Sequence, residues 1–222
     1  MTSPTPLPPA VRVPPELRGG WLRRSIAVGG GPAQETATVW WLQASTRFAD
    51  LRVPLAQDGR AQSFAGATTW EPPALTWEHE LDLEGLADSD TGRVHFDGEL
   101  LVEEGEWAGD SGPRGYVEVW EPMPGTTGTS FALTRGAAPG RLVRTGTRAL
   151  TLVDDRASGG DYTGVGWQLT DAGWTEALRW PPASTAVLPA PPGVCPAAGE
   201  ETTLSDGSVW TVEESAGDGA RP

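Results

Sequence analysis

The sequence contains no lysine, one cysteine and two histidines, and each shortage excludes a class of protein. Its 16 basic residues, all arginine, stand against 30 acidic residues and give a formal net charge of −14. Such a surface repels phosphate groups, and no basic stripe offsets it, so we expect neither nucleic acid nor an anionic membrane as a partner. The lone Cys195 excludes an intramolecular disulfide and a cysteine-based metal cluster.

Long apolar runs and a secretory signal are also missing. No segment approaches the roughly 18 apolar residues that a membrane-spanning helix needs. Residues 1–17 are rich in proline and lack the charged and apolar regions of a signal peptide, so we predict a disordered leader and a cytoplasmic location. His79 and His95 fall on opposite strand faces, and we therefore predict no metal site and no cofactor.

Tryptophan, in contrast, is abundant, with 11 residues spread along the chain. From residue 18 to 180, short segments of alternating apolar and polar residues are separated by Gly, Pro, Asp and Ser turns. Helical periodicity is nearly absent, and only Asp171–Leu178 has the pattern of a short helix. The sequence therefore predicts an all-β fold with little helix, in which about ten antiparallel strands over residues 18–180 close into a barrel.

Residues 181–222 form a third region, rich in proline and alanine. Within it, Thr202–Glu213 is predicted to be a hairpin that turns at Ser205-Asp206-Gly207 and is a candidate for the unit that completes the barrel. The interior of a barrel of this size either is filled by side chains or holds one small ligand. The alternation is compatible with both.

The densest group of polar and aromatic residues lies in Val39–Pro54 (VWWLQASTRFADLRVP). Alternation places Trp41 and Gln43 on one strand face and puts Asp50 in phase with Arg52 on the next strand. The Asp50–Arg52 pair is compatible with an ion pair that lines a pocket, and an arginine fork also suits a ligand carboxylate. A cross-strand pair at the barrel surface is the alternative.

A second group lies in Leu75–Leu83 (LTWEHELDL), where Trp77, His79 and Leu81 share one face and acidic residues the other. The acidic face is expected to be solvated. An inward His79 is compatible with a general base, a haem ligand or a polar anchor, and equally with a core histidine whose hydrogen bonds are satisfied.

The candidate site residues are side chains that share a predicted inward face with tryptophan or with charge. For ligand binding they are Trp41, Gln43, Arg52, Trp77, Glu118 and Trp120, and for acid–base chemistry they are His79 and Asp50. Nucleophile and phosphate motifs are missing, because the chain has neither a G-x-S-x-G elbow nor a Walker A loop.

Several segments together resemble a known family. They are GGWLRRSIAV, WWLQASTRFADLRVP, FAG at residues 64–66, TWEHELDL, DTGRVHFDGELLVEEG and GYVEVWEP, within residues 18–155. This order is similar to that of a lipocalin-like β-barrel family of fungi and bacteria, typified by a yeast protein named for its interaction with a casein-kinase homologue. The resemblance implies a lipocalin-like barrel and no established enzymatic activity.

Three functional hypotheses follow from the sequence. The first is a barrel that binds a small hydrophobic or aromatic molecule in its interior. The second is an isomerase, cyclase or hydratase that acts on a hydrophobic substrate and uses His79 or Asp50 as acid or base. The third is a protein-interaction module that acts through its acidic surface and proline-rich ends, with an unknown protein partner.

Overall fold

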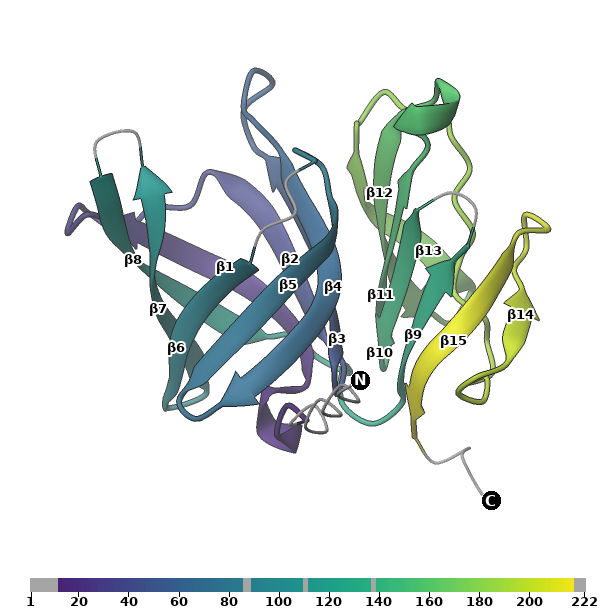
Figure 1. Ribbon diagram of the computed structural model, residues 1–222, viewed down its shortest axis with the longest axis horizontal. Helices are drawn as coiled ribbons and strands as arrows, with labels where there is room; N and C mark the ends of the chain where they lie inside the picture. Colours follow the sequence, from purple (N-terminus) through teal and green to yellow (C-terminus); the bar gives the residue numbers. More distant parts are fainter. Residues whose placement is uncertain (1–11, 86–88, 110–111, 137–138, 218–222) are drawn as a thin grey trace, which may run out of the picture.

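The computed structural model describes residues 12–85, 89–109, 112–136 and 139–217, and it confirms the predicted all-β class. Eight antiparallel strands form a closed barrel in chain order, and seven later strands form a separate sheet beside it (Figure 1). The barrel strands are β1 (Gly19–Val28), β2 (Ala37–Gln43), β3 (Arg47–Pro54), β4 (Gln62–Glu71), β5 (Ala74–Asp82), β6 (Ser89–Asp97), β7 (Leu100–Gly109) and β8 (Gly112–Pro122). The second sheet contains β9 (Ser130–Arg135), β10 (Gly140–Thr145), β11 (Arg148–Asp154), β12 (Tyr162–Thr170), β13 (Gly173–Trp180), β14 (Glu201–Thr203) and β15 (Val209–Ala216).

The barrel closes at Pro122, and this corrects the prediction of one barrel of about ten strands over residues 18–180. Strand β8 pairs with β1, with Trp21 opposite Pro122, so the barrel offers no free edge to a further strand. Of the strands that follow, β9, β10 and β11 at the centre of the second sheet are buried on both faces. In β11, for example, all of Ala149–Val153 is buried. Period-two alternation marks strands but does not say which strands pair, and the sequence pattern therefore merged the two sheets.

The central strands of the second sheet are buried on both faces because they lie between the barrel and the segment that connects β13 to β14. Its strand order is β13-β12-β11-β10-β9-β15-β14. Leu150 and Leu152 on one face pack against Trp40 and Leu51 on the outside of the barrel. The opposite face, which includes Trp210, is covered by the segment between β13 and β14. The proline-rich region 181–200 is therefore a layer of the structure.

Polar contacts join the two sheets at the margin of this interface. Glu214 on β15 accepts hydrogen bonds from the backbone N–H and hydroxyl groups of Ser45 and Thr46 in the β2–β3 turn, at 2.6–2.9 Å. The Tyr162 hydroxyl donates to Ser63 Oγ at 3.0 Å across the interface. These bonds fix the orientation of the barrel on the sheet.

The prediction that residues 1–17 are disordered is wrong for residues 12–17. Val13 and Leu17 are buried in the hydrophobic cluster inside the barrel that includes Trp21 and Trp41. Pro15–Leu17 form a 3₁₀ turn, η1. The Trp21 indole donates to the Leu17 carbonyl at 3.1 Å. This segment therefore closes one end of the barrel. Residues 1–11 of the predicted leader lie outside the described residues.

The strands also test three local predictions: the C-terminal hairpin, the short helix and the inward face of β5. The Thr202–Glu213 hairpin is confirmed as β14–β15, but it pairs with β9 in the second sheet and does not complete the barrel. The helix predicted over Asp171–Leu178 is wrong, because Gly173–Trp180 is strand β13. A β-bulge between Ala65 and Gly66 shifts the phase of β5, so Leu81 leaves the lumen and packs toward the second sheet. No helix in the described part of the chain is long and apolar enough to cross a membrane.

Candidate functional site

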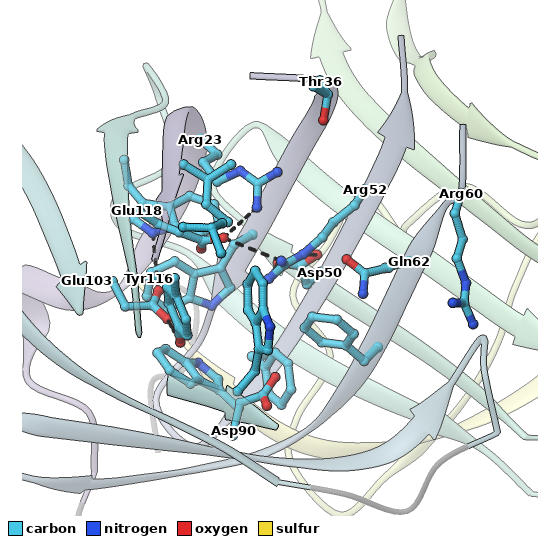
Figure 2. Close-up of a pocket in the computed structure, with 18 of the residues that line it drawn as sticks. Arg23, Thr36, Asp50, Arg52, Arg60, Gln62, Asp90, Glu103, Tyr116 and Glu118 are labelled. Atoms are coloured by element: carbon cyan, nitrogen blue, oxygen red, sulfur yellow. Dashed lines mark hydrogen bonds and ion pairs between the residues drawn. The ribbon is translucent and has the colours of Figure 1, made fainter. Parts of the chain in front are cut away.

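A pocket of about 620 Å³ occupies the barrel lumen (Figure 2). Each of the eight strands contributes at least one residue to the lining. The lining residues lie either at strand positions whose side chains point inward or at the rim of the barrel. The exposed residues Thr36, Arg60 and Gln62 line its outer end, near the β1–β2 and β3–β4 hairpins. The size is that of pockets that enclose a small organic molecule.

Tryptophans form the inner wall of the pocket. The rings of Trp41 and Trp77 are 5.4 Å apart and nearly perpendicular, and Trp41 has the same spacing to Trp120. Trp21 stacks behind Trp41 at 6.1 Å, next to Leu17. The edge-to-face contacts hold these rings in fixed positions, and the wall is therefore rigid and apolar.

A charged cluster crosses one side of the lumen. Glu118 Oε1 accepts from Arg23 Nη1 at 2.5 Å and lies 3.5 Å from Arg52 Nη1, and Figure 2 shows both guanidinium groups directed at it. Arg52 also binds Asp50, with Nε 2.9 Å from Oδ1, and Arg23 binds Glu35 at 2.8 Å. Both arginines are thus matched by carboxylates.

Burial shifts the pKa values within this cluster. Burial raises the pKa of Asp50 although Arg52 opposes the shift. Burial also works against the charged form of Arg52, but Asp50 and Glu118 outweigh it and raise the pKa of the guanidinium. A buried ion cluster contributes little net stability because desolvation offsets attraction. Its presence in a pocket is therefore more typical of a functional site than of a structural core.

Glu103 lies beside this cluster, directly opposite Glu118 in the β7–β8 pairing. Tyr116 donates its hydroxyl to Glu103 Oε1 at 2.8 Å, and the Trp120 indole donates to Oε2 at 3.2 Å. Burial, and then the negative charge of Glu118, raise the pKa of Glu103 to about 8. Near neutral pH the lumen therefore presents Glu103 as a carboxylic acid, next to Glu118 in its ion pairs with Arg23 and Arg52.

Two strand glycines make room for these side chains. A Cβ at Gly92 would lie 2.7 Å from Glu103 Cγ, and a Cβ at Gly105 would lie 2.4 Å from the Tyr116 ring. Glycine inside a strand often marks the close approach of another group. Here it lets Glu103 and Tyr116 lie flat along the wall of the barrel.

Three buried polar atoms in the pocket wall are left without a partner. Among the residues that the structure describes, nothing accepts a hydrogen bond from Trp41 Nε1 or Trp77 Nε1, and nothing donates to Glu118 Oε2. These side chains are only 2%, 6% and 2% exposed, respectively. An unsatisfied buried polar atom costs roughly 1–3 kcal/mol, so all three atoms would gain from the polar groups of a ligand.

The structure brings together most of the residues singled out in the sequence. Asp50, Arg52, Glu118 and the tryptophans Trp41, Trp77 and Trp120 all line the pocket. Gln43 does not line it. Its amide is fully buried and exchanges hydrogen bonds with Thr68 Oγ1 at 3.1 Å, in the β2–β3 turn region.

His79 is also absent from the pocket lining. Its ring stacks on Phe64 at 4.3 Å, Nδ1 lies 3.0 Å from Asp82, and Nε2 lies 3.5 Å from Asp90. Burial lowers the pKa of the imidazole, but the two aspartates outweigh this effect and raise it to about 9. His79 is therefore an ion-paired cation that supports the wall. In the described part of the chain, no three His, Cys, Asp or Glu side chains group as metal ligands.

Sequence reasoning missed Arg23, Glu103 and Tyr116. Arg23 is in phase with the inward Trp21, and Tyr116 with Glu118, so strict alternation identifies both. Glu103 looks like one of many scattered acids. Its only signal is the pair of in-strand glycines that face it and its hydroxyl partner.

The fold and the site together define an eight-stranded barrel with a charged aromatic pocket, fused to a second β-sheet. A family model described as "Protein HRI1" matches residues 21–214, and the chain belongs to this family. The match spans both sheets. No curated protein matches the chain significantly.

Among solved structures, the chain is similar to the crystal structure of the uncharacterized protein YLR301w from the yeast Saccharomyces cerevisiae. The TM-score is 0.69 at 15% sequence identity, and the alignment covers 89% of this chain and 98% of the yeast chain. At this identity the likeness shows that the fold, including both sheets, is shared.

Proposed function

We propose that this protein binds a small molecule with an aromatic or apolar body in its barrel lumen, in the manner of a lipocalin-like carrier. The observation that carries the proposal is the pocket of about 620 Å³, walled by Trp41, Trp77 and Trp120 and closed at one end by η1. Rigid aromatic walls with a few buried polar groups are typical of small-molecule sites.

Titration with prodan, a neutral naphthalene dye, tests this proposal. Saturable enhancement of its emission, at one dye per chain, is the expected result. The variant Gln62→Trp adds an indole at the exposed outer end of the pocket and should weaken binding at least tenfold. Gln57→Trp, which adds the same ring to the β3–β4 loop that precedes Gln62 and lies outside the pocket, is the matched control and should bind normally.

Failure of prodan to bind saturably would contradict the proposal. Equal weakening by Gln62→Trp and Gln57→Trp would also contradict it, because the dye would then sit on the loop and not in the lumen.

A second candidate function, an isomerase that moves a proton within its ligand, is favoured by the Glu103–Glu118 pair. The two residues face each other across β7 and β8. Burial raises the pKa of Glu103 to about 8, so it keeps a proton to donate near neutral pH, and Glu118 Oε2 has no partner among the described residues. In such a reaction Glu118 would take a proton from the carbon next to a carbonyl while Glu103 gives its proton to the carbonyl oxygen. Of the residues expected from the sequence, His79 does not line the pocket, and both carboxylate oxygens of Asp50 accept hydrogen bonds from Arg52, whereas Glu118 Oε2 has no partner among the described residues.

Exchange of the C1 protons of 2-tetralone for deuterium, followed by NMR, tests this second function. The protein should accelerate exchange over buffer, and Glu103→Gln should reduce the acceleration at least a hundredfold. An exchange rate equal to that in buffer would eliminate this candidate and would leave the binding proposal intact.

A further inference from the structure

The buried polar atoms of the pocket wall that lack a hydrogen-bond partner indicate which polar groups a ligand needs. We infer that the lumen selects a neutral aromatic molecule whose head carries both a hydrogen-bond acceptor and a donor, as in a carboxamide or a lactam. This inference rests on the proposed binding function and adds the chemical class of the ligand.

The need for an acceptor comes from two indoles. Trp41 on β2 and Trp77 on β5 both line the pocket, both are more than nine-tenths buried, and within the described residues neither N–H has a partner. Trp21 and Trp120 differ, because their N–H groups donate to the Leu17 carbonyl and to Glu103. A carbonyl oxygen on the ligand would satisfy either free indole.

The need for a donor comes from Glu118. Its Oε1 is held by Arg23 and Arg52, whereas Oε2 is buried in the pocket wall without a partner in the described part of the chain. A carboxylate oxygen accepts but does not donate, so an amide N–H on the ligand is a suitable partner. Such a charge-assisted bond is stronger than one between neutral groups.

An anionic head is disfavoured by the charge balance of the lumen. The two guanidinium groups of Arg23 and Arg52 already contact three carboxylates, those of Glu35, Asp50 and Glu118. At the outer end Arg60 is paired with Glu84 at 3.0 Å. A ligand carboxylate would therefore meet negative charge, and every arginine in the described lining of the pocket is already paired with a carboxylate. The arginine fork for a ligand carboxylate that the sequence suggested is thus occupied by the protein itself.

Displacement of prodan by three matched probes tests the inference. The probes 2-naphthamide, 2-naphthoate and 2-methylnaphthalene share one ring system and differ in the head. We expect 2-naphthamide to displace prodan at least tenfold more tightly than 2-methylnaphthalene, and 2-naphthoate to be the weakest. Equal displacement by all three, or tightest displacement by 2-naphthoate, would overturn the inference while lumen binding stands. Absence of prodan binding itself would overturn both proposals.

Variants of the tryptophans identify the atoms involved. Trp41→Phe and Trp77→Phe keep an aromatic ring and remove the free N–H, so each should reduce the preference for 2-naphthamide over 2-methylnaphthalene by at least threefold. Trp21→Phe is the matched control, because its N–H is already bonded to Leu17 and the residue does not line the pocket. The same loss of preference in Trp21→Phe as in the other two would overturn the assignment. Circular dichroism and the urea midpoint establish that each variant is folded.

Discussion

The two sheets of this protein are built from the same kind of strand but enclose very different interiors. The second sheet buries aliphatic and aromatic side chains on both faces, against the barrel on one side and against the segment between β13 and β14 on the other. The barrel instead encloses tryptophans, two arginines and several carboxylates around a pocket. From this contrast we predict that the second sheet contributes most to the stability of the fold, while the barrel carries the candidate site.

The largest effect is expected from a cavity in the second sheet. Trp210 is 1% exposed and packs in its outer core, so Trp210→Ala should lower the free energy of unfolding by about 3–5 kcal/mol in urea. Val209→Ala, at a position on the same strand that is 50% exposed, is the control and should change it by less than about 0.5 kcal/mol. A loss below about 1 kcal/mol for Trp210→Ala would mean that this sheet is not the stabilising body.

A somewhat smaller loss is expected at the closed end of the barrel. Leu17→Ala should cost about 2–4 kcal/mol, because Leu17 is buried against the tryptophan wall. It should also weaken prodan binding, since Trp21 loses the packing that positions it behind Trp41. Glu16→Ala removes an exposed side chain from the same 3₁₀ turn and should leave both measurements unchanged. Normal dye binding in Leu17→Ala would show that η1 does not shape the pocket.

The pH dependence of the free energy of unfolding is a further difference between the barrel interior and the second sheet, because Glu103 titrates inside the barrel. Glu103 holds its proton up to a pKa of about 8 in the folded state and loses it near 4.5 when unfolded, so the folded state binds more protons between these values. The contribution of Glu103 to stability is therefore complete below pH 4.5 and falls as the pH rises to about 8, by an amount on the order of a few kcal/mol. Glu103→Gln should flatten this slope in urea titrations. An unchanged slope would show that Glu103 is not protonated in the folded protein.

His79 contributes a second slope in the same direction at higher pH. Its folded pKa of about 9 exceeds the ordinary value of 6.5, so its stabilisation is complete below pH 6.5 and is lost as the pH rises through about 9. In Glu103→Gln the part of the slope that arises from His79 should therefore persist, between pH 6.5 and about 9.

The smallest effect is expected at the outer end of the pocket. Arg60 is paired with Glu84, but its side chain is 79% exposed, so Arg60→Gln should change stability by less than about 1 kcal/mol. It should also leave the relative displacement by 2-naphthamide and 2-naphthoate unchanged. A strong gain in 2-naphthamide binding, or a loss of 2-naphthoate binding, would show that Arg60 takes part in head recognition.

Alternation along the sequence predicted much of the lumen but not its boundary. Trp41, Asp50 and Arg52 were placed on inward faces because side chains in regular strands alternate strictly. Alternation no longer gives the correct face of a strand beyond a β-bulge. The register shift between β4 and β5 at Ala65 and Gly66 therefore places Leu81 outside the lumen.

The closure of the barrel and the protonation of Glu103 both depend on contacts between residues that are not neighbours in the chain. The pairing of Trp21 with Pro122 ends the barrel, and no local pattern encodes it. The raised pKa of Glu103 likewise arises from its burial beside Glu118, 15 residues further along the chain. The sequence could therefore predict the strands and many inward residues, but neither the second sheet nor the pairing of Glu103 with Glu118.

A crystal structure of the protein with prodan is the most direct test of the account. We predict electron density for one dye molecule inside the barrel, with its rings against Trp41 and Trp77 and its carbonyl oxygen within hydrogen-bond distance of an indole N–H. Dye bound only on the outer surface, with the lumen closed by its own side chains, would contradict it.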